Sequence, residues 1–339
     1  MTLQSPPPSP TTVTQQPVFK DRKIGLVLFG VLQIGLGCLC ALLIPLMLFG
    51  MIMSKAVPNP AAPPMDAHMI LPAVLVYVVM ASWFIWVGIG SLLARRWARA
   101  LLVATSWMWL VCGLTGLVCV WLILPDMYAQ MAANGQLPQF MVNLMLGITF
   151  VFMVLFYVLL PGCFAWFYGS KNVKATCEFR NPDRCWTDAC PLPVLALSLL
   201  FAFWAFSLLS MGFYGWALPF FGFILSGAAG AAVALATMAF LAYVAWGTYK
   251  LDVRAWTCSV GLVFAWGLSI GLTFSRVSLM DFYAKMNFPQ QQLDLMKQMV
   301  LPHTAMIACF SALWFAGLLG YLLYTRRFYP TKNPNAFTT

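Results

Sequence analysis

The residues best suited to chemistry in this sequence are its two histidines and the methionines near one of them. His68 lies between Met65 and Met69 in the segment MDAHM, and His303 stands near the start of the last apolar run. Thioether sulfur and neutral imidazole together favour Cu(I). These four residues are therefore candidate copper ligands, although methionine also serves as a flexible apolar filler.

The sequence gives weaker support for two other metal centres, a haem and a zinc site. A haem held by both histidines requires them to converge at one membrane boundary. Cys177, Cys185 and Cys190 lie in one loop, but zinc sites typically pair cysteines closely and add a fourth ligand, and no C-x-x-C or nearby histidine is present. We interpret these cysteines as free thiols and predict no cofactor, with copper as the alternative.

A segment that contains Asp and Tyr occurs twice. Leu124–Met131 is LPDMYAQM, and Leu279–Met286 is LMDFYAKM, 155 positions later. Each follows a long apolar run and is predicted to begin a short interfacial helix, where tyrosine rings settle at the headgroup level. The simpler interpretation is a structural cap between spans. The alternative is a paired site at the outer face formed by Asp126, Tyr128, Asp281 and Tyr283.

The sequence carries no complete catalytic motif. It has no phosphate-binding loop, HExxH segment or dinucleotide fingerprint. A serine hydrolase would need a nucleophile near His303. Ser226 precedes a glycine, but Ile224 stands where such motifs usually place another glycine, and nucleophile, base and orienting group must occur together. We predict that the protein is not an enzyme.

Membrane helices are the elements that must position these residues. The 339 residues are 62% hydrophobic and 8% charged, whereas soluble proteins have about 25% charged residues. A bilayer core about 30 Å thick requires roughly 20 apolar residues per helix. Eight such runs are present, at about 24–53, 69–93, 100–124, 141–168, 194–214, 218–247, 256–276 and 300–324. The fold class is therefore an all-α integral membrane protein, with a tight return within Met211–Gly222 between the fifth and sixth spans.

Basic residues predict the orientation, because loops rich in Lys and Arg stay in the cytoplasm. Alternate loops divide them fifteen against four, with only Lys55, Arg276, Lys285 and Lys297 on the outer side. Both termini are therefore predicted to be cytoplasmic. The excess of basic residues on the cytoplasmic side, where they face anionic lipid headgroups, explains the net charge of +10. Nucleic acid is therefore not a predicted partner.

The 155-residue offset also predicts an internal duplication. It aligns Arg99-Ala100 with Arg254-Ala255 and Gly116-Leu117 with Gly271-Leu272. An even number of spans per copy gives two parallel four-helix repeats, related by an axis along the membrane normal. The predicted divisions are a Pro-rich disordered tail (1–23), the first repeat (24–168), a cysteine-containing cytoplasmic linker (169–193), the second repeat (194–325) and a basic tail (326–339).

The middle of each predicted span has no charged residue, which disfavours an ion-coupled carrier. Small residues are present instead, and they permit close contact between helices. The predicted packing residues are Gln33, Gly267, Gly271, Ser226 and Gly230.

The first span also contains GVLQIGLG, from Gly30 to Gly37. These eight residues resemble the G-x-x-Q-I-x-x-G of the first helix in the membrane-spanning four-domains family of tetraspan proteins, and the fifth span has no counterpart. The resemblance implies a four-helix, non-enzymatic membrane component that associates with partners.

The sequence therefore predicts a non-catalytic membrane component or accessory subunit in the lipid bilayer, assembled by helix packing with other membrane subunits as possible partners. The alternative is a transporter that carries neutral, lipidic or copper cargo between the two repeats. Compact loops and the lack of an N-x-S/T acceptor favour the inner (plasma) membrane of a prokaryote.

Overall fold

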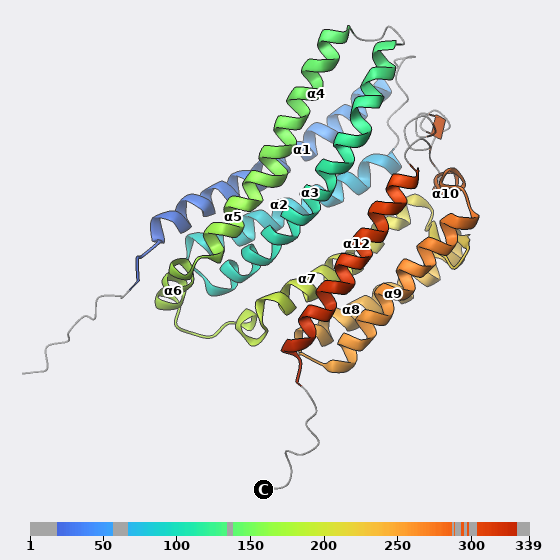
Figure 1. Ribbon diagram of the computed structural model, residues 1–339. Helices are drawn as coiled ribbons and strands as arrows, with labels where there is room; N and C mark the ends of the chain where they lie inside the picture. Colours follow the sequence, from blue (N-terminus) through green and yellow to red (C-terminus); the bar gives the residue numbers. More distant parts are fainter. Residues whose placement is uncertain are drawn as a thin grey trace, which may run out of the picture.

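Eight long apolar helices make up most of the structure, which is a computed structural model (Figure 1). It describes residues 19–56, 67–133, 138–286, 288, 293–294, 297 and 304–330. Each of the eight is long and apolar enough to cross a bilayer. The prediction of an α-helical protein with eight membrane-spanning helices is confirmed at this level.

The first four spans are contributed by the N-terminal half of the chain. They are α1 (Lys23–Ala56), α2 (Ala67–Leu92), α3 (Arg96–Ala133) and a composite helix of α4 (Gln139–Val154), the π-helix η1 (Leu155–Leu159) and α5 (Leu160–Gly169). A linker follows, with α6 (Lys171–Arg180) and the 3-10 turn η2 (Trp186–Ala189).

The other four spans come from the C-terminal half. They are α7 (Leu192–Ser207) with the 3-10 helix η3 (Leu208–Tyr214), α8 (Gly227–Tyr249), α9 (Val253–Arg276), and α12 (Thr304–Thr325) with η5 (Arg326–Phe328). Strands β1 (Leu218–Phe220) and β2 (Phe223–Leu225) form an antiparallel hairpin between α7 and α8, and α10 (Leu279–Lys285) follows α9. The predicted return at Met211–Gly222 therefore contains the end of the 3-10 helix η3 and strand β1 of the hairpin.

Each half has its own core, and the two halves lie side by side (Figure 1). Leu26, Val87 and Phe164 belong to the core of the first half, whereas Phe201 and Leu241 belong to that of the second. A third cluster joins them where α3 contacts α7. Large apolar side chains are exposed along the outward faces of both halves, as expected for helices that lipid surrounds.

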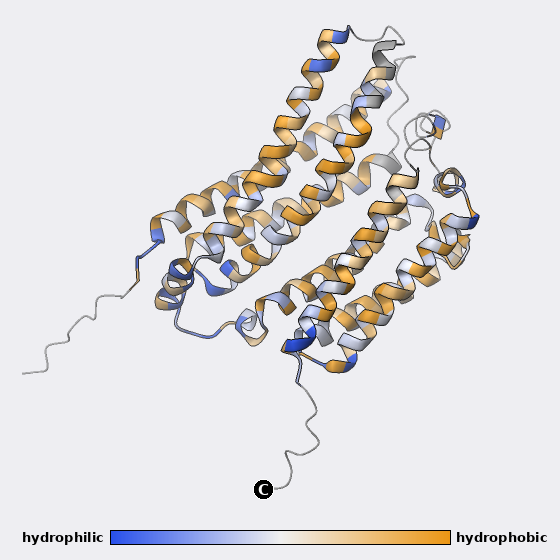
Figure 2. Ribbon diagram, viewed as in Figure 1, coloured by the Kyte–Doolittle hydropathy of each residue, from blue (hydrophilic) through white to orange (hydrophobic). Residues whose placement is uncertain are grey.

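Strongly hydrophilic residues are concentrated at one end of the helices (Figure 2), and most of the basic residues of the described chain belong to segments at this end. This end, called the basic face here, carries the start of α1, the α2–α3 and α8–α9 turns, the linker with α6, and η5. The four basic residues that the sequence assigned to the other side are Lys55, Arg276, Lys285 and Lys297, and they belong to segments at the opposite end.

Glycines allow α1 and α2 to approach each other closely. A Cβ atom on Gly37 would lie 2.6 Å from Ile85 Cγ1 and 3.0 Å from the Ala81 carbonyl oxygen. Likewise, a Cβ atom on Gly30 would lie 3.0 Å from the Gly88 carbonyl oxygen. Helices in lipid associate by such close packing, because burial from water supplies no driving force there.

The two turns at the basic face are built alike. Ala94 N–H donates to Ser91 O, and Leu251 N–H donates to Thr248 O, 157 positions later. Both Ala94 and Leu251 are left-handed, with φ of 49° and 60°. In each turn a glycine faces an alanine: a Cβ on Gly90 would lie 2.6 Å from that of Ala98, and one on Gly247 would lie 2.3 Å from that of Ala255.

The two Asp/Tyr segments differ in structure, so the expectation that both begin a short helix is wrong for the first. Leu124–Met131 lies within α3, which continues through Pro125. The second segment forms α10 after a break at Val277, where the Ser278 side chain accepts a hydrogen bond from Met280 N–H at 3.2 Å. Ile123 stands at the equivalent position before the first segment and cannot cap a helix in this way.

We predict that replacing Gly37 with alanine lowers stability because its new methyl group would collide with α2. Overpacking of this kind typically costs about 1–3 kcal/mol. Gly35→Ala is the matched control, since a Cβ at Gly35 meets no atom within 4 Å. Thermal unfolding in detergent should show a lower midpoint for Gly37→Ala and an unchanged or higher one for Gly35→Ala. Equal midpoints would contradict the α1–α2 packing.

Candidate functional site

The structure leaves the copper hypothesis untested. Met65 and His303 lie outside the described residues, and the side chains of His68 and Met69, at the start of α2, are also outside the description. Among the described residues, no three His, Cys, Asp or Glu side chains form a group that could hold a metal ion.

The paired Asp/Tyr site also remains a prediction. Asp126 and Tyr128 belong to α3, whereas Asp281 and Tyr283 belong to α10 in the other half. Asp281 is exposed and Tyr283 is half-buried, with its ring 6.0 Å from that of Phe288. The side chain of Asp126 is outside the described part of the chain.

The predicted packing residues have different environments. Gln33 is 1% exposed and its side chain faces Gly88 of α2. A Cβ on Gly230 would lie 2.0 Å from the Trp216 carbonyl oxygen, and one on Gly267 would lie 3.3 Å from the Phe315 ring. Gly271 has open space around it. Ser226 is the N-cap residue of α8, without a side-chain capping bond.

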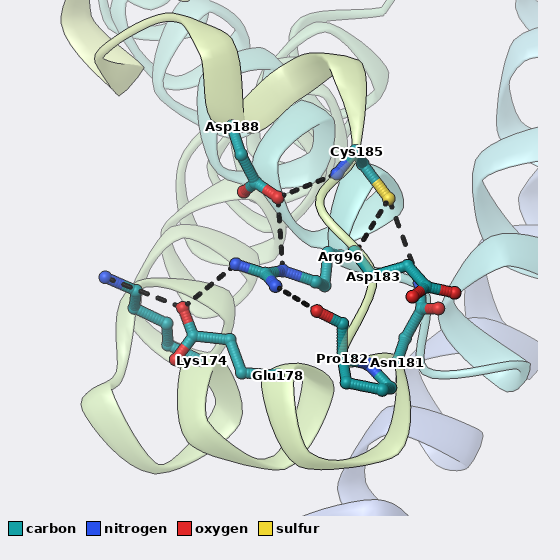
Figure 3. Close-up of polar contacts among 8 residues, drawn as sticks. All are labelled: Arg96, Lys174, Glu178, Asn181, Pro182, Asp183, Cys185 and Asp188. Atoms are coloured by element: carbon teal, nitrogen blue, oxygen red, sulfur yellow. Dashed lines mark hydrogen bonds and ion pairs between the residues drawn. The ribbon is translucent and has the colours of Figure 1, made fainter.

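Ion pairs attach the linker to α3 at the basic face (Figure 3). Arg96 Nε lies 3.2 Å from an Asp188 oxygen, and Arg96 Nη2 lies 3.6 Å from a Glu178 oxygen. Arg96 Nη1 also donates to the Pro182 carbonyl at 3.2 Å. One arginine in the first turn of α3 thus holds both α6 and η2, so the predicted linker has a defined structure.

The three linker cysteines do not share one environment. Cys177 and Cys190 are 1% and 5% exposed, and burial raises the pKa of Cys177 to about 11 and that of Cys190 to about 12. Cys185 is only half-buried, and its sulfur lies 3.8 Å from Asn181 Nδ2 (Figure 3). Cys185 is therefore the most accessible thiol of the three.

An apolar crevice of about 540 Å³ lies among the helices of the described structure. All four spans of the first half contribute to it, together with η3 of the second half. Its lining residues are Leu36, Leu39, Cys40, Leu43, Pro72, Ala73, Val76, Tyr77, Met80, Phe84, Trp109, Phe152, Phe156, Tyr157, Ser210 and Tyr214. Because these residues come from both halves, the crevice lies where the two halves meet. Its volume falls within the roughly 300–1,000 Å³ of small-molecule sites.

The position of the crevice along the helices places it in one half of the bilayer. On α1 it extends from Leu36 to Leu43, which is about 20–30 Å from Lys23 at 1.5 Å per residue. Ser210 is at a similar distance from the start of α7. Since the hydrocarbon core is about 30 Å thick, most of the crevice corresponds to the leaflet farther from the basic face, and its Phe84 end reaches the middle of the core.

One wall of the crevice is formed by a π-helical turn. Pro161 has no N–H for the Tyr157 carbonyl, and in a regular α-helix its ring would also crowd that carbonyl. The chain instead widens at η1, where Leu160 N–H donates to Leu155 O. π-turns of this kind frequently occur at functional sites. Here the widened turn places Phe156 and Tyr157 in the crevice wall.

Gly113 of α3 accommodates the widened turn. A Cβ on this buried glycine would lie 2.1 Å from the Tyr157 carbonyl oxygen and 2.9 Å from its carbonyl carbon. Only glycine therefore permits α3 to approach η1 so closely.

The polar groups of the crevice are uncharged. Tyr77, Tyr157 and Tyr214 bring hydroxyl groups, and among the described residues these hydroxyls have no hydrogen-bond partner. Ser210 Oγ donates to the Ser207 carbonyl at 2.6 Å. An occupant can thus meet hydroxyl groups, whereas no ionised group lines the crevice.

Sequence reasoning missed the crevice, because apolar runs do not indicate which helix faces will leave a gap. Pro161 inside the fourth apolar run was the one local signal, since proline within a helix disturbs the turn before it.

We predict that Gly113→Ala disturbs the crevice wall. Its methyl group cannot coexist with the Tyr157 carbonyl, so α3 and η1 must separate, at a cost of about 1–3 kcal/mol. Gly116→Ala, one turn along the same helix, is the control because its Cβ meets no atom within 4 Å. Thermal unfolding in detergent should distinguish the two variants. An unchanged midpoint for Gly113→Ala would show that the two helices do not make this contact.

Comparison with known proteins finds no matching family, no similar curated protein and no similar solved structure. The resemblance at Gly30–Gly37 therefore stays confined to those eight residues, and the geometry described above has to support the functional argument.

Proposed function

We propose that the protein is a non-catalytic, multi-pass membrane protein that takes up a neutral apolar molecule from the bilayer. The observation that carries this proposal is the crevice between the two halves. Its lining is aliphatic and aromatic apart from hydroxyl groups, one cysteine and backbone. Placing a charged group at this depth would be costly without a partner of opposite charge, so the ligand is neutral in the part that enters.

We also propose that the two halves are parallel copies of one four-helix unit. The matching turns at Ala94 and Leu251 support this. So do the polar contacts beside them: Ser91 Oγ lies 2.7 Å from the hydroxyl of Tyr168, at the end of the fourth span. In the second half, Thr248 lies next to the hydroxyl of Tyr329, just after the eighth span, without a hydrogen bond of ordinary length.

The buried faces of the first and fifth spans support the same duplication. In α1 these are Leu26, Gly30, Gln33 and Gly37, and in α7 the buried set includes Val194, Ser198, Phe201 and Ala205. The spacing is the same in both helices, with an offset of 168. A duplicated unit explains why the chain has a junction between equivalent halves in which a crevice can form.

The basic face is proposed to be cytoplasmic, with both termini on that side and with anionic lipid headgroups around it. Its excess of Lys and Arg supports this orientation. An inner or plasma membrane fits the same charge distribution.

A role as an accessory subunit is the second candidate. Gly271 of α9 and Gly317 and Gly320 of α12 have no atom within 4 Å of a Cβ position. Such open small residues permit close approach by a helix of another protein. Stoichiometric copurification with another membrane protein would favour this role, whereas cargo flux across vesicle membranes would favour a transporter.

We predict that filling the crevice blocks uptake of an apolar probe. An aryl diazirine that partitions into the bilayer should label peptides containing Trp109 and Tyr214 in reconstituted protein, and Val76→Trp should reduce this labelling severalfold. Val78→Trp is the control, because Val76 and Val78 are 48% and 43% exposed on the same helix but only Val76 lines the crevice. Equal labelling of both variants and the wild type would overturn the proposed function.

A second prediction concerns orientation. A membrane-impermeant maleimide should label Cys185 when the cytoplasmic side of the vesicles is accessible and should not label it from the other side. Cys177 and Cys190 should react far more slowly on either side, because they are buried and a thiol of pKa about 11 is only about 0.1% thiolate at pH 8. Mass mapping of the labelled peptides gives the readout. Labelling of Cys185 from the outer side would reverse the proposed orientation.

A further inference from the structure

The length of the crevice along the helices is similar to the thickness of one lipid leaflet. Phe84, Trp109 and Tyr157 lie toward the basic face, about 12, 20 and 18 Å along their helices from the ends at that face, and the ring centroids of Phe84 and Trp109 are 5.7 Å apart. Ser210 and Tyr214 lie at the other end, in η3. The lined path therefore extends from near the middle of the bilayer to its boundary, and this is the span of a single acyl chain.

The chemistry of the lining changes along this path. The deep part is mainly carbon and thioether surface from Phe84, Trp109, Leu36 and Met80, and Tyr157 adds one hydroxyl group there. The boundary end carries the hydroxyl of Tyr214, whose ring stacks on Phe288 with centroids 5.9 Å apart, and the Ser210 hydroxyl. A lipid has the same order of polarity, with a hydrocarbon chain below ester groups that accept hydrogen bonds.

The lining is also uncharged, as an acyl chain is, and part of it is open to the bilayer. It contains no ionised side chain, so it suits the uncharged chain, while the headgroup stays outside at the interface. Leu39, Val76 and Met80 are exposed to the surroundings of the helices, so a chain can enter sideways from the bilayer. The volume of about 540 Å³ admits one chain and leaves no room for a complete phospholipid.

From this match we propose that the crevice binds one acyl chain of a lipid from the leaflet opposite the basic face. The terminal methyl lies at Phe84 and Trp109, and the ester end lies near Ser210 and Tyr214. This inference rests on the proposed function and names the class of its ligand.

Photolabelling with two lipids tests whether an acyl chain occupies the crevice and which of its ends lies at which end of the crevice. The protein is reconstituted in phosphatidylcholine–phosphatidylglycerol vesicles with a trace of phosphatidylcholine that carries a diazirine either near the ester or near the terminal methyl. The methyl-end probe is expected to label peptides with Phe84 and Trp109, and the ester-end probe the peptide with Tyr214. Val76→Trp should reduce both severalfold, and Val78→Trp should leave both unchanged.

The outcomes separate this inference from the proposed function. If both lipid probes give the same peptide pattern, or if Val76→Trp leaves their labelling unchanged while it still blocks the aryl diazirine, the acyl-chain assignment is wrong and the apolar site stands. If Val76→Trp changes neither the lipid probes nor the aryl probe, both are wrong. Thermal unfolding of Val76→Trp shows whether the variant is folded, and the smaller change Val76→Phe replaces it if it is not.

Discussion

Close approach of backbones at glycine is the contact on which this structure depends. Helices that are surrounded by lipid gain little from burying apolar side chains against one another, so they associate where their backbones can come near. Gly37 brings α1 against α2, Gly113 brings α3 against η1, and Gly230 of α8 lies against the Trp216 carbonyl. In each case a methyl group would lie 3.0 Å or less from a backbone oxygen of the neighbour. The arrangement of the first half is therefore set by positions that carry no side chain.

This constraint connects the backbone to the crevice. Pro161 has no N–H to pair with the Tyr157 carbonyl, and at η1 the wider turn removes the conflict between the two groups. A widened helix needs room on its neighbour, which Gly113 provides. The same turn carries Phe156 and Tyr157 into the wall of the crevice. One wall of the crevice thus depends on one proline and one glycine on different helices.

Much of the architecture could be predicted from the sequence, because the length of an apolar run and the position of charged residues are local properties. The predicted run 256–276 lies within Val253–Arg276, and the basic residues gather at one end as the alternation required. The crevice could not be predicted in this way, since it depends on how each helix is rotated about its axis. The first Asp/Tyr segment does not begin a separate helix for a local reason, because Ile123 precedes it, whereas Ser278 precedes the second segment and caps α10.

The proposed duplication shows why a single offset describes such a chain poorly. The Asp/Tyr segments are 155 positions apart, the turns at the basic face 157, and the buried faces of α1 and α7 168. Insertions in loops change these offsets freely, because loops outside the membrane tolerate length changes. The turns cannot vary in this way, since a left-handed residue, a paired carbonyl and a glycine that faces an alanine must keep their spacing. The proposed equivalence of the two halves is therefore supported most strongly by these turns and least by the Asp/Tyr segments, which fold differently.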